Sequence, residues 1–167
     1  MVKKSIGIGL LVCVVFFASL ILIPVSVSPS VSLEIEKSPF SVQQTLSDIK
    51  RFREWDPSVI SDTTVSYEAV VIDGKEGLNV LDSMNNIIAK YSVLSSSIEE
   101  VDIAVELKNV DSFLYQFKLK PTDSGTMLTW DLSLEVNLMM FLFSAEDRLE
   151  EIFLKGLKSF KDLVTKT

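Results

Sequence analysis

The sequence predicts an α+β protein in which a curved antiparallel sheet of about seven strands wraps round a long C-terminal helix, preceded by one transmembrane helix. Three observations predict it: an uncharged apolar run near the N-terminus, a long stretch where apolar residues alternate, and a last stretch with apolar residues at helical spacing. Removing the first 30 residues leaves roughly 135, which suits one domain with one core.

The N-terminal apolar run covers residues 6–25 and contains no charge. A bilayer core of about 30 Å requires about 20 residues of helix, so this run is long enough to span it. Lys3 and Lys4 precede it and no base follows closely, which predicts a cytoplasmic N-terminus and a domain on the outer face. The alternative is a secretory signal cleaved near Ser28, but the apolar part of such signals is usually about 7–15 residues long.

We therefore expect three regions along the chain. Residues 1–25 form a cytoplasmic stub and transmembrane helix, residues 26–30 a short Ser/Pro linker, and residues 31–167 the folded domain. This places the protein in a membrane, single-pass, with its domain outside.

Charge and composition exclude several classes of function. All 23 acids and 14 of the 16 bases follow the apolar run, leaving −9 on the domain, which opposes binding to nucleic acid. The chain has no histidine, so Ser-His-Asp and Cys-His mechanisms are excluded, and zinc or copper sites are not expected. The single cysteine, Cys13, lies in the apolar run, and no cofactor motif is present.

The domain begins with a strand and a helix. Val31, Leu33 and Ile35 alternate with polar residues, as in a half-buried strand. Ser38 and Pro39 then provide an N-cap and a first helical residue. The predicted helix ends before the Trp-Asp-Pro sequence at residues 55–57, because the residue ahead of a proline disfavours helix.

Residues 63–136 alternate with a period of two and predict six antiparallel strands with short turns. The last stretch, from a capping sequence at Ser144 to Val164, keeps strict helical spacing of apolar residues. We expect this helix to pack on the sheet, because the strands need a cover for their apolar face. A sheet curled round a helix leaves a space between them, and spaces of this kind are apolar pockets.

Several short stretches in this order resemble a known superfamily. They are residues 35–42 (IEKSPFSV), 46–49 (LSDI), 52–57 (FREWDP), 117–121 (FKLKP), 125–130 (GTMLTW) and 154–161 (LKGLKSFK). Together they resemble the START-like helix-grip superfamily, in particular the polyketide cyclase/dehydrase and lipid-transport group also called SRPBCC. The match spans nearly the whole domain and implies the helix-grip fold.

The resemblance implies a function only loosely. Relatives bind lipids, sterols, polyketides or hormones, and some catalyse cyclisation or dehydration. Bacterial members with an N-terminal membrane helix exist, which implies the cytoplasmic membrane of a bacterium. The chain departs from the family in having no histidine and a shortened Trp-Asp-Pro segment, so no catalytic residues can be assigned from it.

Eight residues are candidates for lining a cavity between the sheet and the last helix. They are Tyr67, Tyr91, Tyr115, Phe117, Trp130, Phe153, Gly156 and Leu157. The tyrosines fall on inward registers, where a hydroxyl needs a polar partner such as a backbone carbonyl, a water or a ligand oxygen. Trp130 lines the cavity or simply packs the core, and Gly156 allows either close helix–sheet approach or room for a ligand.

The leading hypothesis is a membrane-tethered, non-enzymatic domain that binds a small hydrophobic or amphipathic, lipid-like ligand. The first alternative is a cyclase/dehydrase-like enzyme that uses tyrosine or a buried carboxylate. It is disfavoured because Asp131, Glu106 and Glu135 are expected to face outward. The second alternative is a structural or interaction module whose cavity is filled by its own Trp and Phe side chains. No catalytic residue, metal or cofactor is predicted.

Overall fold

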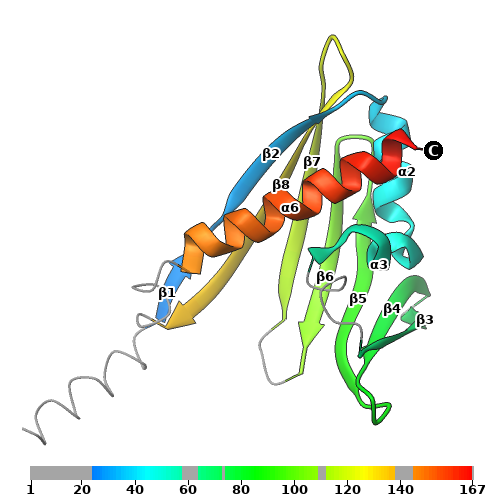
Figure 1. Ribbon diagram of the computed structural model, residues 1–167, viewed down its shortest axis with the longest axis vertical. Coiled ribbons are helices and arrows are strands. Elements are labelled where there is room, and N and C mark those ends of the chain that lie inside the picture. The colour runs from blue at the N-terminus through cyan, green and yellow to red at the C-terminus, as the bar shows by residue number, and fades with distance from the viewer. Residues whose placement is uncertain (1–23, 58–63, 73, 109–111, 138–144, 167) are drawn as a thin grey trace, which may run out of the picture.

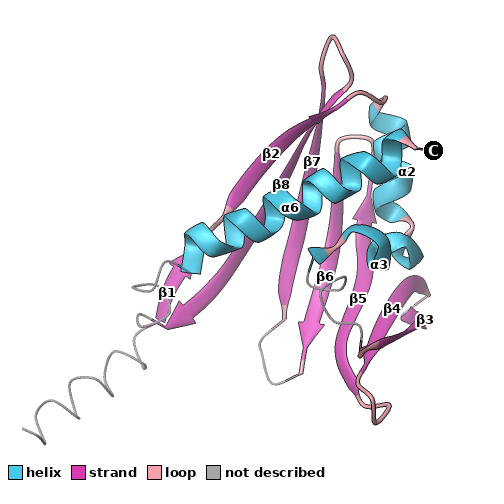
Figure 2. Ribbon diagram, viewed as in Figure 1, coloured by secondary structure: helices cyan, strands magenta, loops and turns pink. Residues whose placement is uncertain are grey.

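The computed structural model describes residues 24–57, 64–72, 74–108, 112–137 and 145–166. Within these residues, eight antiparallel strands form one curved sheet, and helix α6 (Ala145–Thr165) crosses its concave face (Figures 1 and 2). The α+β class, the antiparallel sheet and the long C-terminal helix are confirmed. The sheet has one strand more than expected, and the additional strand is the first one in the chain, at one edge of the sheet.

Six strands form a continuous meander. They are β3 (Ser66–Ile72), β4 (Lys75–Leu81), β5 (Ile87–Ser96), β6 (Glu100–Leu107), β7 (Phe113–Pro121) and β8 (Thr126–Asn137). The first strand of the domain, β2 (Ser30–Ile35), returns along the free side of β8, with Val31 opposite Trp130. Apolar side chains alternate onto the concave face along β5, β6 and β7, as their spacing in the sequence predicts. On the edge strand β3 the predicted alternation is not matched by burial, since Ala69 is exposed and Val71 is 74% exposed.

The additional strand is β1 (Pro24–Val27), which corrects the expected boundary between span, linker and domain. Pro24 and Val25 are expected at the end of the span and Ser26 in the linker, yet all three pair with β8 beyond the start of β2. Val27 is buried at 1% exposure, and the carbonyl of Pro29 accepts a hydrogen bond from the Leu132 N–H. The residues expected to form a short Ser/Pro linker are therefore largely part of the sheet.

The helix expected after β2 is present but broken into three pieces. Helix α2 (Pro39–Ser47) starts as expected, because the Ser38 side chain accepts a hydrogen bond from the Ser41 N–H. It ends at Asp48, whose ψ of 84° is not helical, and the chain continues as η1 (Ile49–Arg51) and α3 (Phe52–Trp55). Hydroxyls in α2 bond to backbone carbonyls four residues earlier, which weakens the helix before the break.

Helix α6 packs against β2, α2 and α3. The helix is amphipathic in the way the sequence predicts, and Phe153, Leu157, Phe160 and Val164 on its apolar side are all buried. The expected cap at Ser144 lies outside the described residues.

In the ranges that the structure describes, no helix is both long and apolar enough to cross a membrane. The expected span at residues 6–25 falls outside these ranges except for its last two residues, which belong to β1. The transmembrane helix therefore stays a prediction.

Candidate ligand-binding face

The eight candidate residues lie where the sheet and α6 face each other. Tyr67, Tyr91, Tyr115, Phe117 and Trp130 lie on the concave side of the sheet, and Phe153, Gly156 and Leu157 on α6. Only Tyr67 is half-exposed; the others are buried. The five candidates on the strands thus lie on the expected concave face, and the three on α6 lie on its expected apolar side.

A cluster of aromatic rings fills the space beneath the middle of α6. The Trp55 ring, on α3, is its centre: ring centroids lie 4.5 Å away for Phe52, 5.0 Å for Phe160, 5.7 Å for Trp130 and 5.9 Å for Phe117. Most of these pairs meet edge to face, a favourable arrangement for aromatic quadrupoles. We call this set, with Tyr115 and Phe153, the aromatic cluster.

Trp130 links the cluster to α6 directly. Its ring stacks on Phe153 with centroids 4.3 Å apart and planes 5° from parallel, and Tyr115 meets both rings at their edges. The indole N–H groups of Trp55 and Trp130 are buried without a hydrogen-bond acceptor.

Gly156 sits where α6 approaches the sheet most tightly. A Cβ atom added there would lie 2.8 Å from Cζ3 of Trp130 and 2.7 Å from Cδ of Pro57. Of the two roles considered for this glycine, the geometry supports close approach. Helix, sheet and the Trp-Asp-Pro segment therefore meet without room for a ligand at this level of the domain.

The concave face is less completely covered beyond the cluster, toward the end of the sheet where β1 begins. Tyr67 lies opposite Val80, Val80 opposite Ala89, and Ala89 opposite Leu107, so one row crosses β3 to β6. Phe113 and Leu134 continue the apolar surface on β7 and β8. Four of these side chains, those of Tyr67, Leu107, Phe113 and Leu134, are half-buried against the core, and we call them the apolar row.

Acidic side chains lie on the opposite, convex face, as the sequence predicts for Asp131 and Glu106. Asp131 accepts hydrogen bonds from Lys118 and Ser30, and Glu106 pairs with Lys90 at 3.6 Å. Partial burial acts to raise the pKa of Asp131, but these two hydrogen bonds and the Lys118 charge outweigh it and hold the pKa below its ordinary value. The side chain of Glu135 lies outside the described residues.

Sequence reasoning missed one buried carboxylate. Asp56, directly after Trp55, is fully buried at the end of α3, where its N–H donates to the Phe52 carbonyl. The only signal was its position between Trp55 and Pro57, which marks a helix end but does not indicate burial.

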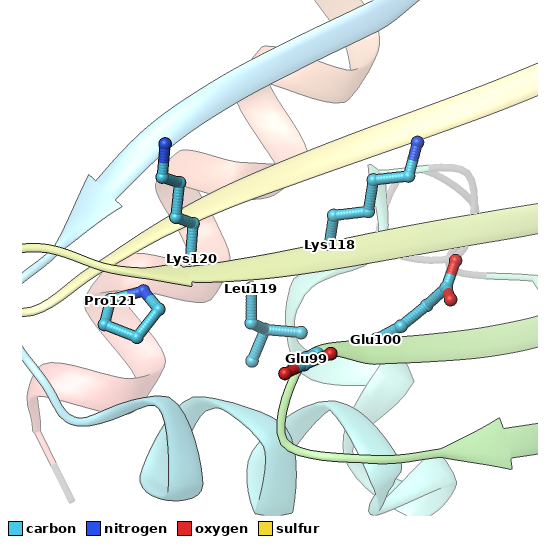
Figure 3. A pocket seen from close by; sticks show the side chains of 6 residues that line it. All are labelled: Glu99, Glu100, Lys118, Leu119, Lys120 and Pro121. Atoms are coloured by element: carbon cyan, nitrogen blue, oxygen red, sulfur yellow. The ribbon is translucent and has the colours of Figure 1, made fainter.

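A depression of about 420 Å³ lies elsewhere, at the opposite end of the sheet (Figure 3). It opens to solvent between the start of β6 and the end of β7, and contains none of the eight candidates. Lys118 and Lys120 extend away from Leu119 and Pro121, and Lys118 is already paired with Asp131. Its mixed charge and shallow form give it no defined ligand.

Comparisons with known proteins show the fold alone. No family model matches the chain, and no curated protein does. Among solved structures, a protein of unknown function, SA2116 from Staphylococcus aureus, aligns with a TM-score of 0.66 at 12% identity, over 86% of this chain and 96% of that one. The protein TTHA0849 from Thermus thermophilus aligns at 0.60 and 14%, over 84% and 98%.

A third similar structure carries a functional name. The di-domain ARO/CYC StfQ from the steffimycin biosynthetic pathway aligns with a TM-score of 0.63 at 9% identity, over 84% of this chain and 51% of that one. The fold is therefore similar to those of the ARO/CYC StfQ, SA2116 and TTHA0849, in agreement with the helix-grip architecture inferred from the sequence.

Proposed function

We propose that the chain is a membrane-tethered module that binds a small hydrophobic or amphipathic, lipid-like molecule without catalysing a reaction. The observation that carries this proposal is the apolar row, a half-buried apolar surface on the concave face beside the aromatic cluster. Concave apolar surfaces with a few polar groups, here the Tyr67 hydroxyl, are the usual setting for such ligands. The ligand would lie at this end of the sheet rather than beneath the middle of α6.

The position of β1 supports a retained N-terminal anchor. Cleavage near Ser28 would remove β1, whose Val27 is buried and whose four residues pair with β8. A mature chain that starts there would lose part of its own sheet. The uncharged run at residues 6–25 would instead continue directly into the domain, because its last two residues, Pro24 and Val25, are the first two of β1.

Full-length protein in detergent tests ligand binding. Native mass spectrometry should find a co-purifying lipid-sized mass, and a panel of fatty acids, phospholipids and polycyclic aromatics should contain members that raise the melting temperature. Leu107→Gln, in the apolar row, should abolish the rise. Ile98→Gln, an exposed apolar residue at the other end of the sheet, is the matched control and should keep it. An empty protein with no response to the panel contradicts the proposal.

The aromatic cluster favours a second candidate, an interaction module whose interior is filled by its own side chains. Its close packing, with Gly156 against Trp130, requires no ligand for stability. Under this reading the melting temperature is insensitive to every compound, and Leu107→Gln lowers it whether or not lipid is present. The cyclase-like alternative is not favoured. The described acids of the sheet, Asp131 and Glu106, face outward, and the buried Asp56 belongs to the Trp-Asp-Pro segment, which packs closely against Gly156.

A further inference from the structure

The end of the sheet at which the N-terminal segment enters is defined by the strand pairing. Pro24, the first residue of β1, lies opposite Asn137 at the end of β8. Most of the 23 residues before it form the uncharged run. If that run spans a bilayer, the start of β1 lies at the membrane surface, and so does this end of the sheet.

The hairpin between β4 and β5 reaches the same end. Strand pairings join Ser133, Leu114, Ala104, Ser92 and Gly77 into one row across the sheet. From this row β8 runs four residues to the partner of Pro24, about 13 Å, and β5 runs back five residues to its start at Ile87, beside the hairpin turn, about 17 Å. In Figure 1 the start of β1 lies at the lower left and this turn at the bottom right, so both lie at the lower end of the sheet but toward its two opposite edges.

The turn is built to present apolar side chains outward. The Asp82 carboxylate accepts hydrogen bonds from the backbone N–H groups of Met84 and Asn86 and from the Asn86 side chain. Asn85 takes the left-handed conformation, with φ of 61°. Held in this way, Met84 is 77% exposed and Ile87, at the start of β5, is 41% exposed.

The charges around the turn suit a bilayer interface. No charged residue lies between Asp82 and Lys90. The one carboxylate of the turn, that of Asp82, is bonded to Met84 and Asn86 and interacts with the Lys108 charge. The backbone N–H of Lys108 donates to the Ile88 carbonyl, which places this lysine beside the turn, and its side chain is exposed. An apolar tip with a neighbouring lysine can enter the interface, with the ammonium at the headgroups.

We propose that the β4–β5 turn is a second contact with the bilayer, with Met84 and Ile87 in its interfacial region. Together with the start of β1 it fixes the domain so that the apolar row, which lies at this end, faces the membrane. The inference rests on the proposed anchor. It adds that lipid would reach the apolar row from the bilayer rather than through water.

Fluorescence quenching in vesicles tests it with the full chain. Met84→Cys, in a Cys13→Ser background, carries an environment-sensitive dye, and the protein is reconstituted in phosphatidylcholine–phosphatidylglycerol vesicles with nitroxide-labelled lipid. The dye should shift to shorter wavelength and be quenched. The same dye at Ile98→Cys, which is 56% exposed in the β5–β6 turn at the other end of the sheet, should show neither effect.

The outcomes separate this inference from the proposed anchor. A chain that floats with vesicles while Met84 and Ile98 dyes behave alike keeps the anchor and overturns the contact. A chain that does not float overturns both. A second test uses the double variant Met84→Asp with Ile87→Asp, which should leave flotation and the melting temperature unchanged. In this variant, a dye attached at Lys108→Cys should become more exposed to aqueous quencher. An unchanged exposure of that dye contradicts the contact.

Discussion

At Gly156 the absence of a side chain determines how closely α6 approaches the sheet. The ring of Trp130 and the ring of Pro57 occupy the positions that a Cβ atom would need. Both neighbours are stiff, and Trp130 is held between Phe153 and Tyr115. The sequence shows only a glycine on an apolar stripe; the contacts show that it serves packing.

Replacement of Gly156 tests this reading of the packing. In a helix interior, Gly→Ala ordinarily stabilises by about 1 kcal/mol, whereas overpacking costs about 1–3 kcal/mol. We expect Gly156→Ala to lower the free energy of unfolding, measured by urea denaturation in detergent. Lys155→Ala, exposed on the same helix, should change it little. A stabilising Gly156→Ala would mean that open space separates helix and sheet.

Asp131 should make stability depend on pH on the acid side. Its pKa is lowered in the folded protein, so its contribution is present above the unfolded pKa of about 3.9 and is lost as pH falls through the lower folded value. We expect Asp131→Asn to cost up to about 1 kcal/mol at neutral pH, since the pair is near the surface. The difference between mutant and wild type should shrink below about pH 4.

Thermal unfolding across pH measures this effect. Glu106→Gln, which breaks the longer and more exposed pair with Lys90, is the control and should cost less. An Asp131→Asn difference that stays constant down to low pH would show that the lost packing, and not the charge, matters there.

At the scale of elements, the spacing of apolar residues predicted the strands and helices that bury one face against the core. It did not predict β1, which is defined by its backbone pairing with β8. Strands β5, β6 and β7 follow apolar alternation and α6 follows helical apolar spacing, because one face of each is buried. Residues 24–27 (PVSV) have no such pattern that separates them from the preceding apolar run, so β1 was missed. The break at Asp48 was missed because apolar spacing continues through it.

The candidate site shows the same division. Strand alternation placed the five candidates of the sheet on the concave face, and helical spacing placed the three candidates of α6 on its buried side. They did not reveal that Trp55, from a short helix, reaches the centre and fills the space between Trp130 and Phe160. Which side chain fills a void depends on three-dimensional distances, which spacing along the chain does not contain.

The strand β1 makes a prediction of its own. Burying a valine contributes about 1.5–3 kcal/mol, so Val27→Ser should lower the free energy of unfolding by about that amount. Ser26→Ala, on the exposed side of the same strand, should change it by less than about 0.5 kcal/mol. Chemical denaturation of the two variants distinguishes a strand from a linker, because in a linker both substitutions would be neutral.

For the whole molecule, β1 couples the domain to whatever precedes it. A flexible linker would let the domain rotate freely above a membrane, whereas β1 pairs with β8 almost from the end of the apolar run. The proposed anchor, the apolar row and the β4–β5 turn then belong to one end of the sheet. The acidic character of the chain means that charge attraction to anionic lipid is not what holds it there.

The proposed topology predicts which side of the membrane the domain occupies. Because Lys3 and Lys4 precede the run, a C-terminal alkaline phosphatase fusion should be active in a bacterial host, and a reporter that fluoresces only in the cytoplasm should be dark. Replacing both lysines with glutamate should reduce the difference between the two reporters.

The protein extracted from membranes should retain its N-terminus by intact mass, because a cut near Ser28 removes β1. A mature N-terminus at Pro29 with unchanged melting temperature would show that β1 is dispensable and that the chain is released.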